Sequence, residues 1–198
     1  RSAELIVMNL AGEVLAQTQK TYRYPMPEDI LSDLSERIDK ISAELSEHQR
    51  SRLCGIGIAA PHEIWSWTKV LGAPEEFAIW RNFDIRSAVA EICALPVTIE
   101  NDGTAACRAE HVFGRGKEFF DYAYFFIGSF IGGGVVMNSA VVVGAKNNAG
   151  AFGSLRVPSP DEAEVPLIDA ASLYLLETAI VRDGLDASAL WQFPQDWS

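Results

Sequence analysis

Cysteine, histidine and methionine are scarce in this sequence, with three of each among 198 residues. Cys54, Cys93 and Cys107 are widely spaced in apolar surroundings, and no Cys-x-x-Cys pair occurs. This spacing excludes a disulfide framework and supplies no cysteine-based metal site. The cysteines are therefore predicted to be buried, reduced thiols of a cytoplasmic protein.

Positive charge is also scarce. The chain has 16 Lys and Arg residues and 27 Asp and Glu residues, which gives a formal net charge of -11. An acidic surface repels phosphate backbones, so this segment is not expected to bind nucleic acid by itself. Long apolar runs are missing too, and none reaches the roughly 18 residues of a membrane-spanning helix. The first residues, Arg1-Ser2-Ala3-Glu4, do not resemble a signal peptide. The chain is expected to have no membrane partner.

Apolar residues make up 48% of the chain, and their patterning predicts an α/β protein. Strands alternate with helices in the first half, and a new run of three strands follows a helix at 104–113. This change of pattern predicts a first lobe over residues 1–104 and the start of a second lobe over 105–198. The predicted strands are 4–10, 14–22, 53–60, 96–100, 122–127, 133–137 and 140–143, and the main predicted helices are 27–45, 84–94, 104–113 and 168–182.

Asp102 is the main candidate for chemistry. It follows the predicted strand 96–100, in the sequence Glu100-Asn101-Asp102. A carboxylate in such a place can accept the proton of a hydroxyl that attacks phosphorus, and Asn101 beside it can bond to neighbouring hydroxyls. The alternative is structural, because Asp102 precedes a helix and would suit the N-cap position.

Residues 128–134 read Gly-Ser-Phe-Ile-Gly-Gly-Gly and separate two strand-like runs. Glycines let backbone N–H groups approach a phosphate closely, and Ser129 could add a hydroxyl donor. Gly128, Ser129, Gly132 and Gly133 are therefore candidate phosphate-binding residues. A tight hairpin turn explains the same glycines without any ligand.

Other polar and aromatic residues carry weaker signals. His62 follows a predicted strand, where ligand loops often gather, although a lone histidine is more often structural. His48 and His111 lie in polar helical stretches and are expected to be solvated, so the histidines define no metal site. Trp65, Trp67 and Trp80 occupy a segment without clear periodicity. Their rings could stack on a sugar, fill space between lobes or contact a second subunit.

In combination, these segments resemble the ROK family of repressors, open reading frames and sugar kinases. The segments that match are 10–14, 55–61, 95–102, the glycine run 128–134, and 149–154 (Ala-Gly-Ala-Phe-Gly-Ser). The resemblance implies an actin-like ATPase (ribonuclease H-like) fold with two lobes around a cleft. It implies that Asp102 is the catalytic base, and that 149–154 is a sugar-contact segment. Glu100, Asn101, Asp102, His62 and Ser154 become candidate sugar-binding residues.

The chain departs from the family pattern at its ligand-contacting positions. Ala151 replaces a sugar-contacting glutamate, and Ser154 replaces a histidine that usually opens a zinc site. Because no cysteine follows Ser154, zinc is not expected. Phe130 replaces a glycine of the phosphate loop, and His62 a glycine after Pro61. The first phosphate loop is expected before Arg1 and the adenosine motif after Ser198, so the fold is expected to be incomplete at both ends.

The sequence favours the effector domain of a sugar-sensing transcriptional regulator, with a DNA-binding winged helix before Arg1 and outside this chain. No cofactor is then expected, and DNA is contacted only through the other domain. The main alternative is an ATP-dependent sugar kinase with Asp102 as base, which would need ATP and Mg²⁺. A third possibility is an oligomerisation module that uses the tryptophan-bearing segment. A homodimer is expected because dimers are usual in such families.

Overall fold

The computed structural model describes residues 2–22, 24–61, 63–68, 72–160 and 163–191. The chain divides into two compact units, Arg1–Glu100 and Asn101–Ser198. Among the described residues, none of the helices combines the length and apolar character that crossing a membrane requires. The sequence predicted two lobes around a cleft, with the first lobe ending at residue 104. That arrangement stays a prediction.

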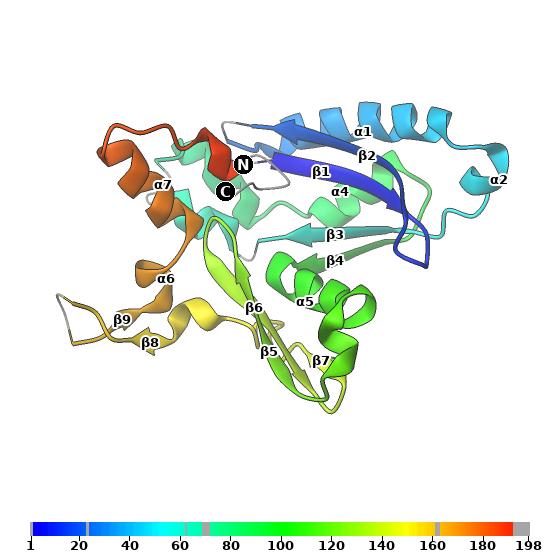
Figure 1. The fold of residues 1–198 in the computed structure, drawn as a ribbon. Helices are drawn as coiled ribbons and strands as arrows, with labels where there is room; N and C mark the ends of the chain where they lie inside the picture. The colour runs from blue at the N-terminus through cyan, green and yellow to red at the C-terminus, as the bar shows by residue number, and fades with distance from the viewer. Residues whose placement is uncertain (1, 23, 62, 69–71, 161–162, 192–198) are drawn as a thin grey trace. The chain divides into compact units, whose positions relative to one another are not determined.

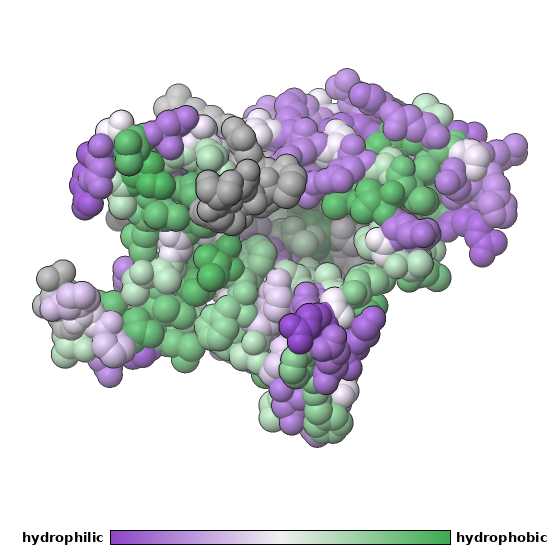
Figure 2. Space-filling model, in the orientation of Figure 1, coloured by the Kyte–Doolittle hydropathy of each residue, from purple (hydrophilic) through white to green (hydrophobic). Residues whose placement is uncertain are grey.

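The first unit begins with the predicted hairpin, in which β1 (Ser2–Met8) pairs antiparallel with β2 (Val14–Thr21). The turn is held by Asn9, whose side-chain oxygen accepts the backbone N–H groups of Ala11 and Glu13 at 2.9 and 3.0 Å. α1 (Pro27–Glu44) follows, with Pro27 in its first turn, where a missing N–H has no cost. Hydrophilic residues cover the outward side of α1 (Figure 2).

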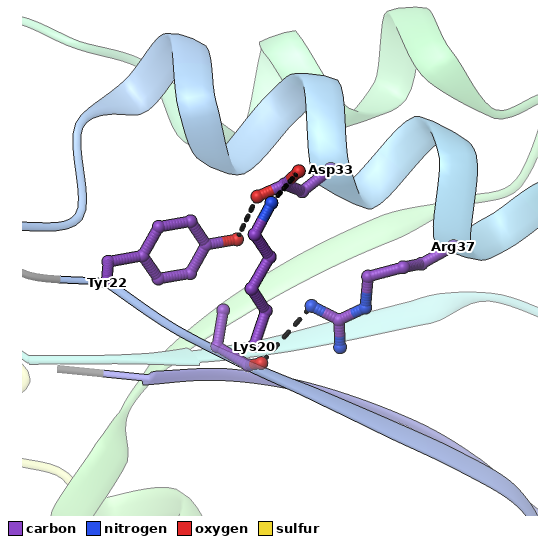
Figure 3. Close-up of polar contacts among 5 residues, drawn as sticks. Lys20, Tyr22, Asp33 and Arg37 are labelled. Carbon is purple, nitrogen blue, oxygen red and sulfur yellow. Dashed lines mark hydrogen bonds and ion pairs between the residues drawn. The ribbon is translucent and has the colours of Figure 1, made fainter.

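A polar cluster joins α1 to this hairpin (Figure 3). The Tyr22 hydroxyl donates to Asp33 Oδ2 at 2.7 Å, and Lys20 forms an ion pair with Asp33 Oδ1. Arg37, one turn further along α1, donates to the backbone carbonyls of Ala3 and Thr18. Burial, followed by the hydrogen bond and charge of Asp33, raises the pKa of Tyr22 to about 12. The helix is thus fixed to both strands by specific bonds as well as by apolar packing.

The rest of the first unit contains α2 (Glu47–Arg50), the paired strands β3 (Ile56–Ala60) and β4 (Val97–Asn101), η1 (Ile64–Trp67), η2 (Glu75–Arg81) and α4 (Ile85–Ile92). The helix predicted to begin at residue 84 is confirmed as α4, and Asp84 caps it by accepting the Ser87 N–H at 3.1 Å. The prediction that 53–60 forms a buried strand is wrong in part. Only 56–60 are extended, and Gly57 is exposed, with Thr98 Oγ1 4.0 Å from where its β-carbon would lie.

Trp80 is part of the core of the first unit. Its side chain is 9% exposed, its Nε1 donates to Pro25 O at 2.8 Å, and its ring meets Phe83 edge-on. Phe77, on the same helical segment, is 1% exposed. The interpretations of Trp80 as a sugar platform or a subunit contact are therefore wrong, since its ring and its N–H are both engaged within the unit.

The second unit is built on a three-stranded antiparallel sheet in the order β5 (Tyr122–Ile127), β6 (Ile131–Met137), β7 (Ala140–Val142), which confirms the predicted meander (Figure 1). α5 (Asp102–Phe113) packs on this sheet, mainly against β6, and ends at Gly114 as predicted. Asn138 and Ser139 both have positive φ and form the β6–β7 turn. The remaining elements are η3 (Arg115–Glu118), η4 (Phe152–Ser154), β8 (Arg156–Val157), β9 (Val165–Pro166), α6 (Leu167–Ala170), α7 (Leu173–Arg182) and η5 (Ser188–Trp191).

Two sequence predictions for this unit are corrected. The helix predicted over 168–182 is divided into α6 and α7, because Ala171 is extended and Ser172 caps α7 by accepting the Leu175 N–H at 3.1 Å. His111 is half-buried rather than solvated. Its Nε2 lies 3.0 Å from Ser139 O, which can only accept, so Nδ1 accepts from the Tyr122 hydroxyl at 3.2 Å.

Candidate functional site

Asp102 is the first residue of α5, and the residue before it caps the helix. Asn101 ends β4 in an extended conformation, and its side-chain oxygen accepts the Thr104 N–H at 3.1 Å. The alternative prediction that Asp102 is the N-cap is therefore wrong. The Asp102 carboxyl does not cap α5.

The Asp102 side chain is half-buried and carries few bonds. Its Oδ1 accepts the backbone N–H of Gly103 at 2.8 Å and a side-chain N–H of Asn101 at 3.1 Å. Burial nevertheless dominates and raises the pKa of Asp102 above its ordinary value. A carboxylate with a raised pKa is a better proton acceptor, and it also accepts hydrogen bonds from hydroxyl groups. This position can therefore serve either as a general base or as a polyol contact.

Three segments distant in sequence meet at Gly133. A β-carbon on Gly103, directly after Asp102, would lie 2.9 Å from Gly133 N. A β-carbon on Gly150, directly before Ala151, would lie 1.9 Å from Gly133 O. The start of α5, the middle of β6 and the loop at 149–153 are thus in backbone contact. The structure brings together three of the segments that the sequence singled out.

The surroundings of the glycines in the run 128–134 differ from one position to the next. A β-carbon at Gly133 would lie 1.9 Å from Tyr124 O, and one at Gly134 would lie 2.4 Å from Cys107 Cβ, so both positions are fixed by packing. At Gly128 the nearest atom would be the Phe126 ring at 3.0 Å, whereas nothing lies within 4 Å at Gly132. Gly132 is therefore the glycine of β6 at which the backbone is open to approach.

Residues 128–130 form the three-residue turn between β5 and β6, so the hairpin interpretation is right for this part of the run. Gly128 N donates to Phe130 O at 3.2 Å, and Ile127 pairs with Ile131. The turn is also bound by α7, whose first two N–H groups, from Leu173 and Tyr174, donate to the carbonyls of Gly128 and Ser129 at 3.0 and 3.3 Å.

Phe130 reinforces the contact between this turn and α7. Its ring lies against the ring of Tyr174, with centroids 5.9 Å apart. The N–H groups at the start of a helix are the ones that would otherwise attract an anion, and here two of them bind the turn. Sequence reasoning missed Leu173 and Tyr174; the available signal was Ser172, a good cap residue inside an apolar helical pattern.

The loop at 149–154 lies beside this site and satisfies much of its own hydrogen bonding. Ser154 Oγ donates to Ala151 O at 2.8 Å, and the N–H groups of Ala151 and Phe152 donate to Asn148 O and Gly150 O. Phe152 packs on Phe125, with ring centroids 4.7 Å apart. Ala151 is exposed. The predicted contact residue Ser154 therefore points its hydroxyl hydrogen back into its own loop.

The structure says less about the other candidate residues. Glu100 is half-buried near the end of β4, and His62 lies outside the described residues. No group of three His, Cys, Asp or Glu side chains that could hold a metal ion occurs in the described part of the chain. The roles assigned to these residues, like the expected lack of cofactors, stay predictions.

Residues 1–166 match the sequence model of the ROK family. The chain is 30% identical over 154 residues to the xylose repressor of Bacillus subtilis, covering 77% of this chain and 39% of the repressor. It is 33% identical over 135 residues to a beta-glucoside kinase of Listeria innocua, covering 65% of this chain and 46% of the kinase. The chain thus spans less than half the length of these two relatives.

Among solved structures, the fold resembles a ROK family glucokinase from Streptomyces griseus in complex with glucose and AMPPNP. The TM-score is 0.68 at 23% identity, over 95% of this chain and 60% of the glucokinase. The chain belongs to the ROK family, and its α/β fold is the actin-like ATPase fold that the sequence resemblance implied. The family relatives include both repressors and sugar kinases.

Proposed function

We propose that this chain is the sugar-binding part of a sugar-sensing transcriptional regulator, and that Asp102 and Asn101 hold the sugar. One observation carries the proposal. The acid at the start of α5 is half-buried and not committed to capping, whereas α7 and the Phe130–Tyr174 contact occupy the turn at 128–130. A kinase must position its phosphoryl donor as well as its base. The structure supports a polyol contact better than a donor site.

In this proposal, the sugar binds one conformation of the protein more tightly than another and so raises the population of that conformation. A DNA-binding module outside the chain responds to the change. Glu100, His62 and Ser154 belong to the proposed sugar contacts. The predicted homodimer and cytoplasmic location belong to the same proposal, and neither ATP, Mg²⁺ nor zinc is required. The name of the xylose repressor, a relative that covers most of this chain, is consistent with such a role.

The second candidate function is an ATP-dependent sugar kinase. The raised pKa of Asp102 favours it, because a general base works best when its pKa approaches the working pH. In a kinase, Gly128, Ser129, Gly132 and Gly133 would contact the donor phosphates. The open backbone at Gly132 is the feature of the run that fits this role.

Calorimetric titration of the full-length protein with a sugar panel tests the proposal, together with ADP release in the presence of ATP and Mg²⁺. We expect sugar binding without ADP release, and loss of binding in Asp102→Asn. Asp183→Asn, which changes an exposed carboxylate at the end of α7, is the matched control and should bind normally. Sugar-dependent ADP release that Asp102→Asn abolishes while binding persists would show a kinase instead.

A further inference from the structure

The candidate site has two unlike sides. One side, at 101–104, offers the Asp102 carboxyl, whose Oδ1 accepts two hydrogen bonds, and the Asn101 amide beside it. The other side, at 149–153, reads Ala-Gly-Ala-Phe-Gly and has no side chain that can form a conventional hydrogen bond. Both sides contact Gly133 through Gly103 and Gly150. A sugar held by Asp102 therefore lies close to an apolar loop.

Three of the five backbone N–H groups of this loop already have partners. The N–H of Ala149 donates to Val143 O at 3.0 Å, that of Ala151 to Asn148 O at 3.1 Å, and that of Phe152 to Gly150 O at 2.7 Å. Ala151 O already accepts both the N–H and the hydroxyl of Ser154. A ligand hydroxyl that packs against the Ala151 side chain would lose water without gaining an equivalent partner there.

The far side of the loop is also apolar. A β-carbon on Gly153 would lie 3.3 Å from Ile168 Cβ, so the first turn of α6 packs directly behind the loop. Phe152 is fixed by its ring contact with Phe125. The apolar wall is thus backed by packed side chains, and it can persist when a ligand binds.

We propose that the ligand is a deoxygenated sugar, in which hydrogen or a methyl group replaces one hydroxyl of a common hexose on the edge that faces Ala151. This inference rests on the proposed sugar-binding function and specifies its ligand class. The hydroxyls on the opposite edge bind Asp102 and Asn101, while the deoxygenated edge contacts the loop. Apolar walls discriminate against an added hydroxyl by roughly 10- to 100-fold.

Titration calorimetry of the full-length protein with matched sugar pairs tests this inference. The pairs are D-glucose with its 2-deoxy and 6-deoxy forms, D-mannose with its 6-deoxy form, and D-galactose with its 6-deoxy form. We expect at least one deoxy sugar to bind about 10-fold or more tightly than its parent. The same sugar should lose affinity in Asp102→Asn.

Two substitutions at the exposed Ala151 refine the test. Ala151→Gln introduces a donor and an acceptor without charge, so it should reverse the preference within the best pair. Ala151→Leu adds a side chain of similar length without polar atoms and should keep the preference for the deoxy form.

If every parent hexose binds as tightly as its deoxy forms, and Asp102→Asn still abolishes binding, the inference is wrong and the proposed function stands. If Ala151→Gln and Ala151→Leu change the preference alike, the loop does not select by hydrogen bonding, and the inference is also wrong. If no sugar in either series binds, both the inference and the proposed function fail.

Discussion

The side-chain oxygen of Asn101 accepts the backbone N–H of Thr104 at 3.1 Å, so α5 is capped by the residue before Asp102. The adjacent residues therefore have separate duties. Asn101 caps the start of the helix, and Asp102 presents a half-buried carboxyl. The two duties can be separated by substitution.

Asn101→Ala should lower the free energy of unfolding by about 1 kcal/mol, because α5 loses its side-chain cap. Asn101→Ser, which can still cap, should recover most of that loss. Urea unfolding followed by circular dichroism measures both changes. An Asn101→Ala variant as stable as the native protein would show that the cap does not hold the helix.

The raised pKa of Asp102 predicts a specific pH dependence of stability. The folded state binds the proton more tightly than the unfolded state, so this group favours folding at low pH. Its contribution is lost as the pH rises from the ordinary aspartate value of 3.8 through the higher folded value. Asp102→Asn lacks this titration, so its stability relative to the native protein should increase between pH 4 and 7. Parallel urea unfolding across that range measures the difference, and a constant difference would contradict the prediction.

The same substitution should have a large effect on stability at Gly133 and a small one at Gly132. Gly133→Ala places a β-carbon 1.9 Å from Tyr124 O, and it should cost about 1–3 kcal/mol or prevent folding. Gly132→Ala meets no atom within 4 Å and should change stability by less than about 0.5 kcal/mol. Thermal unfolding of the two variants compares them directly. Equal losses at both positions would show that strand geometry, rather than the contacts at Gly133, requires glycine.

Tyr22→Phe should destabilise the protein by about 1 kcal/mol near neutral pH, because the hydrogen bond to Asp33 is lost. In the native protein the raised pKa of Tyr22 stabilises the fold below pH 10, and this contribution is lost as the pH rises from about 10 to about 12. The difference between native and variant proteins should therefore shrink in that window.

Asp33→Asn tests the cause of the shift. It keeps the Tyr22 ring but removes the neighbouring charge, so ultraviolet titration of tyrosine should move to lower pH. An unchanged titration would assign the whole shift to burial.

Most elements could be predicted from the sequence because their signals are local. Asp84 and Gly114 lie at the ends of α4 and α5, and continuous apolar runs mark β5 and the second half of β6. The helix over 168–182 was predicted without its break, because Ser172 interrupts the apolar pattern by only one residue. Local sequence signals predict where helices and strands lie, but they do not reveal a short break within a helix.

The candidate site was predictable in its residues but not in its geometry. Asp102 and the glycine run stood out by type, yet the meeting of Gly103, Gly133 and Gly150 depends on backbone contacts across tens of residues. The partnership of Phe130 with Tyr174 likewise joins a turn to a distant helix. The polar neighbours of His111 suggested solvent exposure, whereas its ring bridges Tyr122 and Ser139. Such pairings are decided by tertiary packing.

The glycine junction at Gly133 also bears on how such a protein can change over evolutionary time. Its three segments meet through main-chain atoms, so the contacts do not depend on the side chains at positions 102 and 151. New chemistry at the site therefore requires only exchanges at the residues beside the junction, with no redesign of the scaffold. A single lineage can in this way give rise to catalysts and sensors while the backbone stays the same.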